Sequence, residues 1–162
     1  MKVLDNIPLM DDNKLAILFS NALEMKRKKK NEDNANLVIS AVQSEWRIRL
    51  DLFKQGNYKA DRPDQGILAT VGYKVGNDGV SKEIREYLLD YIITSQLPPI
   101  GSPAYISEWG EENSPLRYKK LHRVIRVLAS SAISLGNMNK AATEWEEDLL
   151  YIEEKWSYLK NK

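Results

Sequence analysis

Apolar residues recur every three or four positions along most of this chain, and that spacing predicts helices. No segment convincingly alternates apolar and polar residues in the way that a half-buried strand would. Six helices are expected, at about 11–30, 32–53, 63–73, 81–96, 115–135 and 137–159. The pattern therefore predicts an all-α protein.

Residues that favour helix ends stand where the periodic segments begin and stop. Candidate N-caps precede four of the expected helices: Asp11, Ser81, Ser114 and Asn137. Pro63 and Pro115 suit the first turn of a helix, and Gly136 suits the position just past a helix end.

Short connections join the first two expected helices and the last two, so each pair predicts an antiparallel helical hairpin. Between them, the polar stretch KQGNYKADRPDQG predicts a loop. We expect an N-terminal hairpin at 1–60 and a C-terminal helical domain at 61–162, whether the two stay separate or fold together as one unit.

The crossover segment IGSPAYISEWGEENSP, residues 100–115, carries two large aromatic residues and is not expected to be a regular helix. In a structural interpretation, Tyr105 and Trp109 are buried and hold the crossover against the helices. In a functional interpretation they face outward as binding anchors beside Arg117 and Lys120. The structural interpretation is preferred, because large aromatic side chains are seldom exposed.

Composition narrows the chemistry. The 162 residues include no cysteine, which excludes disulfides, thiol nucleophiles and thiolate zinc sites. A single histidine, His122, gives little basis for a metal site or a catalytic triad. The start of the chain lacks the apolar core of a signal peptide, and no run is long enough to span a membrane, so a cytoplasmic protein is expected. We expect no catalytic residue, metal or cofactor.

The net charge of +1 hides an uneven distribution. Residues 115–135 contain five cations and no acid: Arg117, Lys119, Lys120, Arg123 and Arg126. Lys119, Arg123 and Arg126 lie with His122 opposite the apolar stripe of this helix. This basic stripe has three interpretations: a solvated face partly neutralised by the last helix, a phosphate-binding surface, or a protein-binding surface.

A second basic patch ends the first helix and consists of Lys26, Arg27, Lys28, Lys29 and Lys30. Cations stabilise a helix C-terminus, and a charged tip keeps a hairpin soluble. That structural interpretation is preferred over a nucleic-acid or membrane-surface role, because no aromatic residues are interleaved with the run.

Two further patterns favour structural interpretations. Residues 67–92 outline a helix-turn-helix, but the second helix would expose three carboxylates to the DNA phosphates. Its expected exposed residues are Lys82, Glu83, Arg85, Glu86 and Asp90. Glu144, Glu147 and Asp148 lie within one turn of each other, and we interpret them as part of a solvated acidic face rather than an ion site.

Three blocks in order resemble a bacterial and prophage-associated family of uncharacterised helical domains: GYKVGNDGVSKEIREYLLDYI, LPPIGSPAYISEWGEENSPLRYKKLHRVI and AATEWEEDLLYIEEKW. The shared pattern is G-Y-x-V-G, an Arg-bearing helix, L-P, S-P-x-Y, W-G, a basic helix and W-x-x-D-L. The resemblance covers residues 66–158 and implies a separable hairpin before them, but it implies no activity. The matching residues are Gly72, Tyr73, Val75, Gly76, Arg85, Ser102, Pro103, Tyr105, Trp109, Gly110, Trp145, Asp148 and Leu149.

The sequence favours a non-enzymatic binding module with a protein partner. The alternative is a nucleic-acid-binding protein that uses the basic stripe of the 115–135 helix. A homodimer is a further hypothesis. It would form through an apolar row on the last helix: Trp145, Leu149, Ile152, Trp156 and Leu159. No membrane partner is expected.

Overall fold

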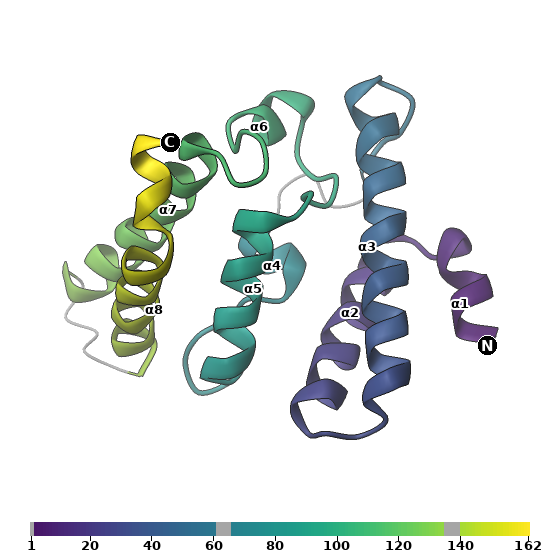
Figure 1. Ribbon diagram of the computed structural model, residues 1–162, viewed down its shortest axis with the longest axis horizontal. Coiled ribbons are helices and arrows are strands. Elements are labelled where there is room, and N and C mark those ends of the chain that lie inside the picture. Colours follow the sequence, from purple (N-terminus) through teal and green to yellow (C-terminus); the bar gives the residue numbers. More distant parts are fainter. Residues whose placement is uncertain (1, 61–65, 135–139) are drawn as a thin grey trace. The chain divides into compact units, whose positions relative to one another are not determined.

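The computed structural model describes residues 2–60, 66–134 and 140–162, with the side chains of residues 133 and 134 left aside. The described residues form helices and no strand, which confirms the all-α class (Figure 1). They belong to two compact units: Met1–Gly72 with Gln96–Ile106, and Tyr73–Ser95 with Ser107–Lys162. The expected boundary after residue 60 does not coincide with this division, because residues 66–72 and 96–106 group with the N-terminal helices.

The first unit is built on a helical hairpin. Its elements are α1 (Lys2–Asn6), the 3-10 turn η1 (Ile7–Leu9), α2 (Asp12–Arg27), α3 (Glu32–Lys54), α4 (Ile67–Val71) and most of α6 (Pro103–Ser107). The Asp11 carboxylate accepts a hydrogen bond of 2.8 Å from the Lys14 N–H, so the predicted cap of α2 is confirmed. Phe19 and Trp46 meet in the hairpin core with ring centroids 4.8 Å apart.

Both helices of this hairpin end in the same hydrogen-bonded motif. After α2, the Lys30 and Lys29 N–H groups donate to the carbonyls of Met25 and Lys26. The corresponding bonds after α3 run from Asn57 to Leu52 and from Gly56 to Phe53. Each pair is a Schellman motif, which needs one residue with positive φ. Lys29 supplies it after α2 at φ 55°, and Gly56 supplies it after α3 at φ 79°.

A buried arginine fastens the hairpin to the start of the chain. Arg49 Nη1 donates to Asp12 Oδ1 at 2.9 Å, and its Nε donates to Glu45 Oε1 at 2.8 Å. Its Nη2 donates to the Met10 carbonyl oxygen at 2.6 Å. Tyr58 completes the cluster by donating to Asp12 Oδ1 at 2.7 Å. The periodicity of α3 does not distinguish this inward-facing arginine from exposed Arg47.

The second unit contains α5 (Lys82–Thr94), α7 (Pro115–Ser134), α8 (Lys140–Trp156) and the 3-10 turn η2 (Ser157–Asn161). Each of these three α-helices packs on the other two. Side-chain caps confirm two predictions: Ser81 Oγ accepts from the Ile84 N–H, and Ser114 Oγ accepts from the Arg117 N–H. The expected roles of Pro63, Gly136 and Asn137 lie outside the described residues.

The crossover segment differs from its prediction, because α6 gives it one regular turn. Ser102 Oγ accepts a hydrogen bond of 3.2 Å from the Tyr105 N–H, and Pro103 begins the helix. Ser102-Pro103 therefore starts a helix in the same way as Ser114-Pro115 starts α7. The sequence signal was present, but five residues are too few for hydrophobic periodicity to register.

Candidate functional site

Arg85 on α5 lies in the interior of the second unit, where its residue is only 1% exposed. The prediction that it stands on an exposed face is wrong. α5 is buried around more than half of its circumference, since Leu88 and Ile92 on one side and Leu89 and Ile93 on another are each at most 1% exposed. Burying a charged side chain on such a helix is very costly unless that charge is paired and hydrogen-bonded.

Acidic side chains of α8 surround Arg85. Its Nε donates to Asp148 Oδ2 at 2.8 Å, its Nη1 donates to Glu144, and its Nη2 lies 3.3 Å from Glu147 Oε2. Tyr73 Oη also donates to Asp148 Oδ2, at 2.5 Å. These acids were predicted to be a solvated face, but Glu144 and Asp148 are buried and Glu147 is the exposed member.

The electrostatics of this Arg85 cluster follow from burial and close charges. Burial is the largest influence on Tyr73 and, with the Asp148 carboxylate beside it, raises the pKa of this phenol well above its ordinary value. Burial alone would lower the pKa of Arg85, but the Asp148 hydrogen bond and charge outweigh it, so the pKa is raised. Arg85 is therefore a permanent cation, and Tyr73 stays neutral throughout the physiological range.

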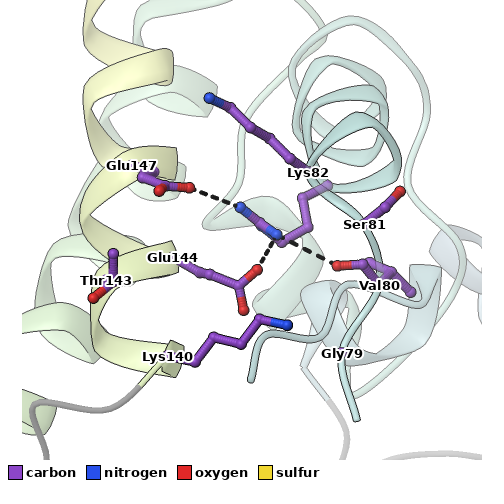
Figure 2. Close-up of a pocket in the computed structure, with 9 residues that line it drawn as sticks. Gly79, Val80, Ser81, Lys82, Lys140, Thr143, Glu144 and Glu147 are labelled. Atoms are coloured by element: carbon purple, nitrogen blue, oxygen red, sulfur yellow. Dashed lines mark hydrogen bonds and ion pairs between the residues drawn. The ribbon is translucent and has the colours of Figure 1, made fainter. Parts of the chain in front are cut away.

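A pocket of about 510 Å³ opens beside this cluster. In Figure 2, Glu144 and Glu147 project from one helix toward the side on which Val80 and Ser81 lie. Each nitrogen of the Arg85 guanidinium already donates to a protein oxygen, including the Val80 carbonyl, and the carboxylates already accept from Arg85. Among the residues described by the structure, no group of three acidic or histidine side chains is placed to hold a metal ion. The cluster joins α5 to α8, and we interpret its role as structural.

Arg117, predicted to contact a partner, is buried instead. Its guanidinium donates to carbonyl oxygens of four residues: Ile92, Ser95, Trp109 and Gly110. Burial lowers the pKa of Arg117 to about 10. Because Arg117 is 3% exposed and lies one turn from buried Leu121, it faces the interior and cannot belong to a contact surface.

The aromatic pair of the crossover divides between the two units. Trp109 is 1% exposed in the second unit, which confirms the structural interpretation for this residue and removes it from the predicted contact surface. Lys120 lies over its ring at 5.8 Å and pairs with Glu108 at 3.1 Å. Tyr105 is half-buried in the first unit, where its hydroxyl oxygen accepts a hydrogen bond of 3.2 Å from the Ile67 N–H.

The rest of the predicted basic stripe is exposed on α7. Lys119, Arg123 and Arg126 are exposed, and no ion pair joins them to any acid within the described ranges. His122 differs, because it is half-buried and its Nε2 lies 2.9 Å from Glu153 Oε1. Leu116 and Val127 flank the cations and are 49% and 53% exposed. We call Leu116, Lys119, Arg123, Arg126 and Val127 the α7 outer face.

The second predicted basic patch is partly neutralised within the first unit. Arg27 and Lys28 both pair with Glu24, and the Arg27 hydrogen bond is the largest of the causes that lower the Glu24 pKa. Lys28, Lys29 and Lys30 form the turn after α2, where cations complement the helix dipole. This arrangement supports the structural interpretation of the run.

The apolar row predicted for a homodimer points into the second unit. Ile152 and Leu159 are fully buried, and Trp145, Leu149 and Trp156 are half-buried. The Trp156 Nε1 donates to Asp90 Oδ1 at 2.9 Å, which ties this end of α8 to α5. Ile152 and Leu159 belong to the unit's own core and are not accessible to a second copy, so a dimer through this row stays a prediction for the three half-buried residues only.

Comparisons of the chain with protein-family models, with curated proteins and with solved structures found no match. None of the described helices is both long enough and apolar enough to cross a membrane. On the surface formed by the described residues, the α7 outer face is the strongest candidate for a functional site.

Proposed function

We propose that this chain is a non-enzymatic binding module that uses the α7 outer face to bind an acidic protein surface. The observation that carries the proposal is the group of three exposed cations without intramolecular ion pairs in the described chain: Lys119, Arg123 and Arg126. They stand on a 20-residue helix that contains no acid.

The positions of these cations suit a continuous contact. Lys119, Arg123 and Arg126 follow the spacing i, i+4 and i+7, so they form one ridge about 10 Å long. Exposed Leu116 and Val127 add apolar area beside the ridge. Arginine together with apolar side chains is a composition typical of protein-protein interfaces.

Four of the six acids of α8 are engaged with other residues and offer this ridge little compensation. Glu144, Glu147 and Asp148 bind Arg85 on the α5 side, and Glu153 is engaged with His122. Exposed charges are attracted to an oppositely charged partner, which raises the association rate and selects among partners. The free cations of α7 thus favour a partner that presents carboxylates.

A nucleic-acid partner has weaker support than the sequence alone gave it. Of the five cations in residues 115–135, Arg117 is buried and Lys120 pairs with Glu108, so three remain available. Three phosphate contacts would give log affinity a slope of only about −2.7 against log salt concentration. We therefore keep nucleic acid as an outcome of the test rather than as a second proposal.

The test is affinity capture from a lysate of the cells in which the protein occurs, followed by mass spectrometry. The variant Lys119→Glu/Arg123→Glu/Arg126→Glu should lose the captured partner, whereas Lys14→Glu/Arg47→Glu/Lys54→Glu, equal in charge but on exposed sites of the first unit, should retain it. Capture that is unaffected by the α7 variant would contradict the proposal. So would a low-salt gel shift of mixed DNA or RNA that the α7 variant abolishes while no protein is captured.

A further inference from the structure

The outward surface of α8 carries the opposite charge to the α7 outer face. Glu146, Leu150 and Glu154 are exposed at the spacing i, i+4 and i+8, and Leu150 is 54% exposed. We call these residues the α8 outer face. No ion pair joins Glu146 or Glu154 to another residue in the described parts of the chain. One unit therefore presents a basic ridge and an acidic ridge, each with exposed apolar area.

These two ridges flank the same seam between α7 and α8. His122 bonds to Glu153 across that seam, and Lys160 lies over the Tyr118 ring at 5.8 Å. Tyr118, nearer the start of α7, contacts Lys160 beyond the end of α8, whereas His122, further along α7, contacts Glu153 within α8. The two helices therefore run antiparallel, as Figure 1 also shows. Lys119 and Arg126 lie about one turn to either side of His122 along α7.

The acidic ridge lies on the other side of that seam. Leu150 is one turn and Glu146 two turns from Glu153, so both share its side of α8, while Glu154 is adjacent to it in sequence. The surface that covers the seam is thus basic along one edge and acidic along the other. Such a surface is complementary to itself.

We propose that the partner of the α7 outer face is a second copy of this chain, which binds through the α8 outer face in a two-fold symmetric dimer. The proposal rests on the proposed function, because it names the partner of the same surface. A two-fold axis parallel to the helices lays α7 of each copy antiparallel on α8 of the other. The result is a four-helix arrangement with two identical basic-on-acidic contacts.

Charge selects this axis over the alternative one. A two-fold axis across the helices would lay α7 on α7 and α8 on α8, with like charges in apposition, which is unfavourable. The parallel axis also preserves the height of each residue along the helices. Measured from the His122–Glu153 pair, Arg123 and Glu154 are then within about 3 Å of the same height, as follows from the helical rise. Arg126 falls between Leu150 and Glu146, within about 5 Å of either height.

The test is the mass of the full chain in solution by sedimentation velocity. The wild-type chain should form dimers at about 50 mM salt and dissociate progressively toward about 500 mM, because exposed ion pairs are screened. The variants Arg123→Glu/Arg126→Glu and Glu146→Lys/Glu154→Lys should each be monomeric, with association weakened at least about tenfold by like-charge contacts. An equimolar mixture of the two should recover the dimer, since each variant then faces the opposite charge.

Two controls keep this test decisive. Arg47→Glu/Lys54→Glu alters the same net charge at exposed sites of the first unit and should leave the dimer intact. If either reversal variant loses its helical circular dichroism, Arg123→Gln/Arg126→Gln and Glu146→Gln/Glu154→Gln replace them, and each should weaken the dimer.

Several results would overturn the dimer. They are a wild-type chain that is monomeric at low salt, a dimer that survives both reversals, or a variant mixture that stays monomeric. A monomeric wild-type chain whose α7 outer face still captures a different acidic protein would overturn the dimer and leave the proposed function in place. If the wild-type chain neither captures an acidic protein nor self-associates, both proposals are overturned.

Discussion

Arg85 shows how a single charged residue can organise the core of a small unit. Asp148 is fully buried, and only one of its carboxylate oxygens accepts hydrogen bonds from the described residues. Arg85 and Tyr73 are the two donors to that oxygen. A buried ion pair of this kind adds little stability over an apolar substitute for both partners, but the loss of one partner is costly.

Replacing Arg85 should therefore be among the most damaging single changes in the second unit. We expect Arg85→Met to lower the free energy of unfolding by about 3–5 kcal/mol, because it leaves the Asp148 charge buried without its cation. Urea unfolding followed by circular dichroism measures this. Arg123→Met, on the exposed side of α7, should change the value by less than about 0.5 kcal/mol.

A double substitution separates the lost ion pair from lost packing. Adding Asp148→Asn to Arg85→Met removes the buried charge, so the double variant should be more stable than Arg85→Met alone. If the two changes simply add, the Arg85–Asp148 pair is not the source of the stability.

The buried Tyr73 phenol predicts a loss of stability in alkali. Its pKa in the folded chain is raised above the ordinary value near 10, chiefly by burial. Above about pH 10 the unfolded chain releases this proton and the folded chain keeps it, so the free energy of unfolding falls by up to about 1.4 kcal/mol per pH unit for this group. Tyr73→Phe should make the alkaline slope shallower by that amount.

Unfolding curves at several values of pH between about 9 and 11 would measure the change in slope. Tyr158→Phe is the matched control, because Tyr158 is 62% exposed. An equal slope in wild type and Tyr73→Phe would show that the phenol ionises within the folded chain.

The paired ends of α2 and α3 allow a test at the scale of the element. Both helices finish with a Schellman motif, but α2 places Lys29 where α3 has Gly56. A non-glycine residue with positive φ costs about 1 kcal/mol or somewhat more. We expect Lys29→Gly to raise the free energy of unfolding by about 1 kcal/mol and Gly56→Ala to lower it by a similar amount.

Thermal or urea unfolding of the two variants provides the measurement. Lys30→Gly is the matched control for Lys29→Gly, because it removes the same charge from a position without positive φ. It should be neutral or destabilising. A stabilisation by Lys30→Gly as large as that by Lys29→Gly would indicate relief of charge repulsion rather than of backbone strain.

At the scale of the element, the sequence predicted the helices that have long apolar stripes and recognisable capping residues. The helices now seen as α2, α3, α5, α7 and α8 were all expected, and the caps Asp11, Ser81 and Ser114 were expected as well. The five-residue helices α1 and α6 were missed, because so short a segment shows no helical period. The equally short α4 was expected, since it lies within the helix predicted at 63–73.

The candidate site was predictable for the same reason, but only in part. Lys119, Arg123 and Arg126 lie opposite the apolar stripe of α7, and the wheel placed them outward correctly. Arg117 lies at the edge of that stripe, where rotation on a wheel cannot distinguish an inward from an outward guanidinium. Only the carbonyls supplied by two other segments reveal its burial.

On the scale of the whole molecule, the segment Gln96–Ile106 is the least expected feature. It belongs to the first unit although residues of the second unit precede and follow it. Leu97 and Ile100 are each 1% exposed, and the Tyr105 hydroxyl oxygen accepts from the Ile67 N–H. The segment thus completes the unit that begins at the N-terminus.

Tyr105→Phe tests how much this attachment contributes. The change removes one acceptor and leaves the Ile67 N–H without it, so the free energy of unfolding should fall by about 1 kcal/mol. Hydrogen exchange should report the loss at α4, with Tyr158→Phe as an exposed control. An unaltered exchange rate at Ile67 would mean that water replaces the phenol at no cost.

The chain enters and leaves the first unit more than once, and this has a consequence for its synthesis. A ribosome makes α5 before it makes residues 96–106, so the N-terminal unit cannot be finished when α5 emerges. Nascent α5 must then wait, with Ile84, Leu88 and Ile92 uncovered, until α7 and α8 have also been translated. The first unit therefore cannot finish folding before synthesis of the second unit has begun. Incomplete chains expose apolar surface, which is the kind of surface that chaperones bind.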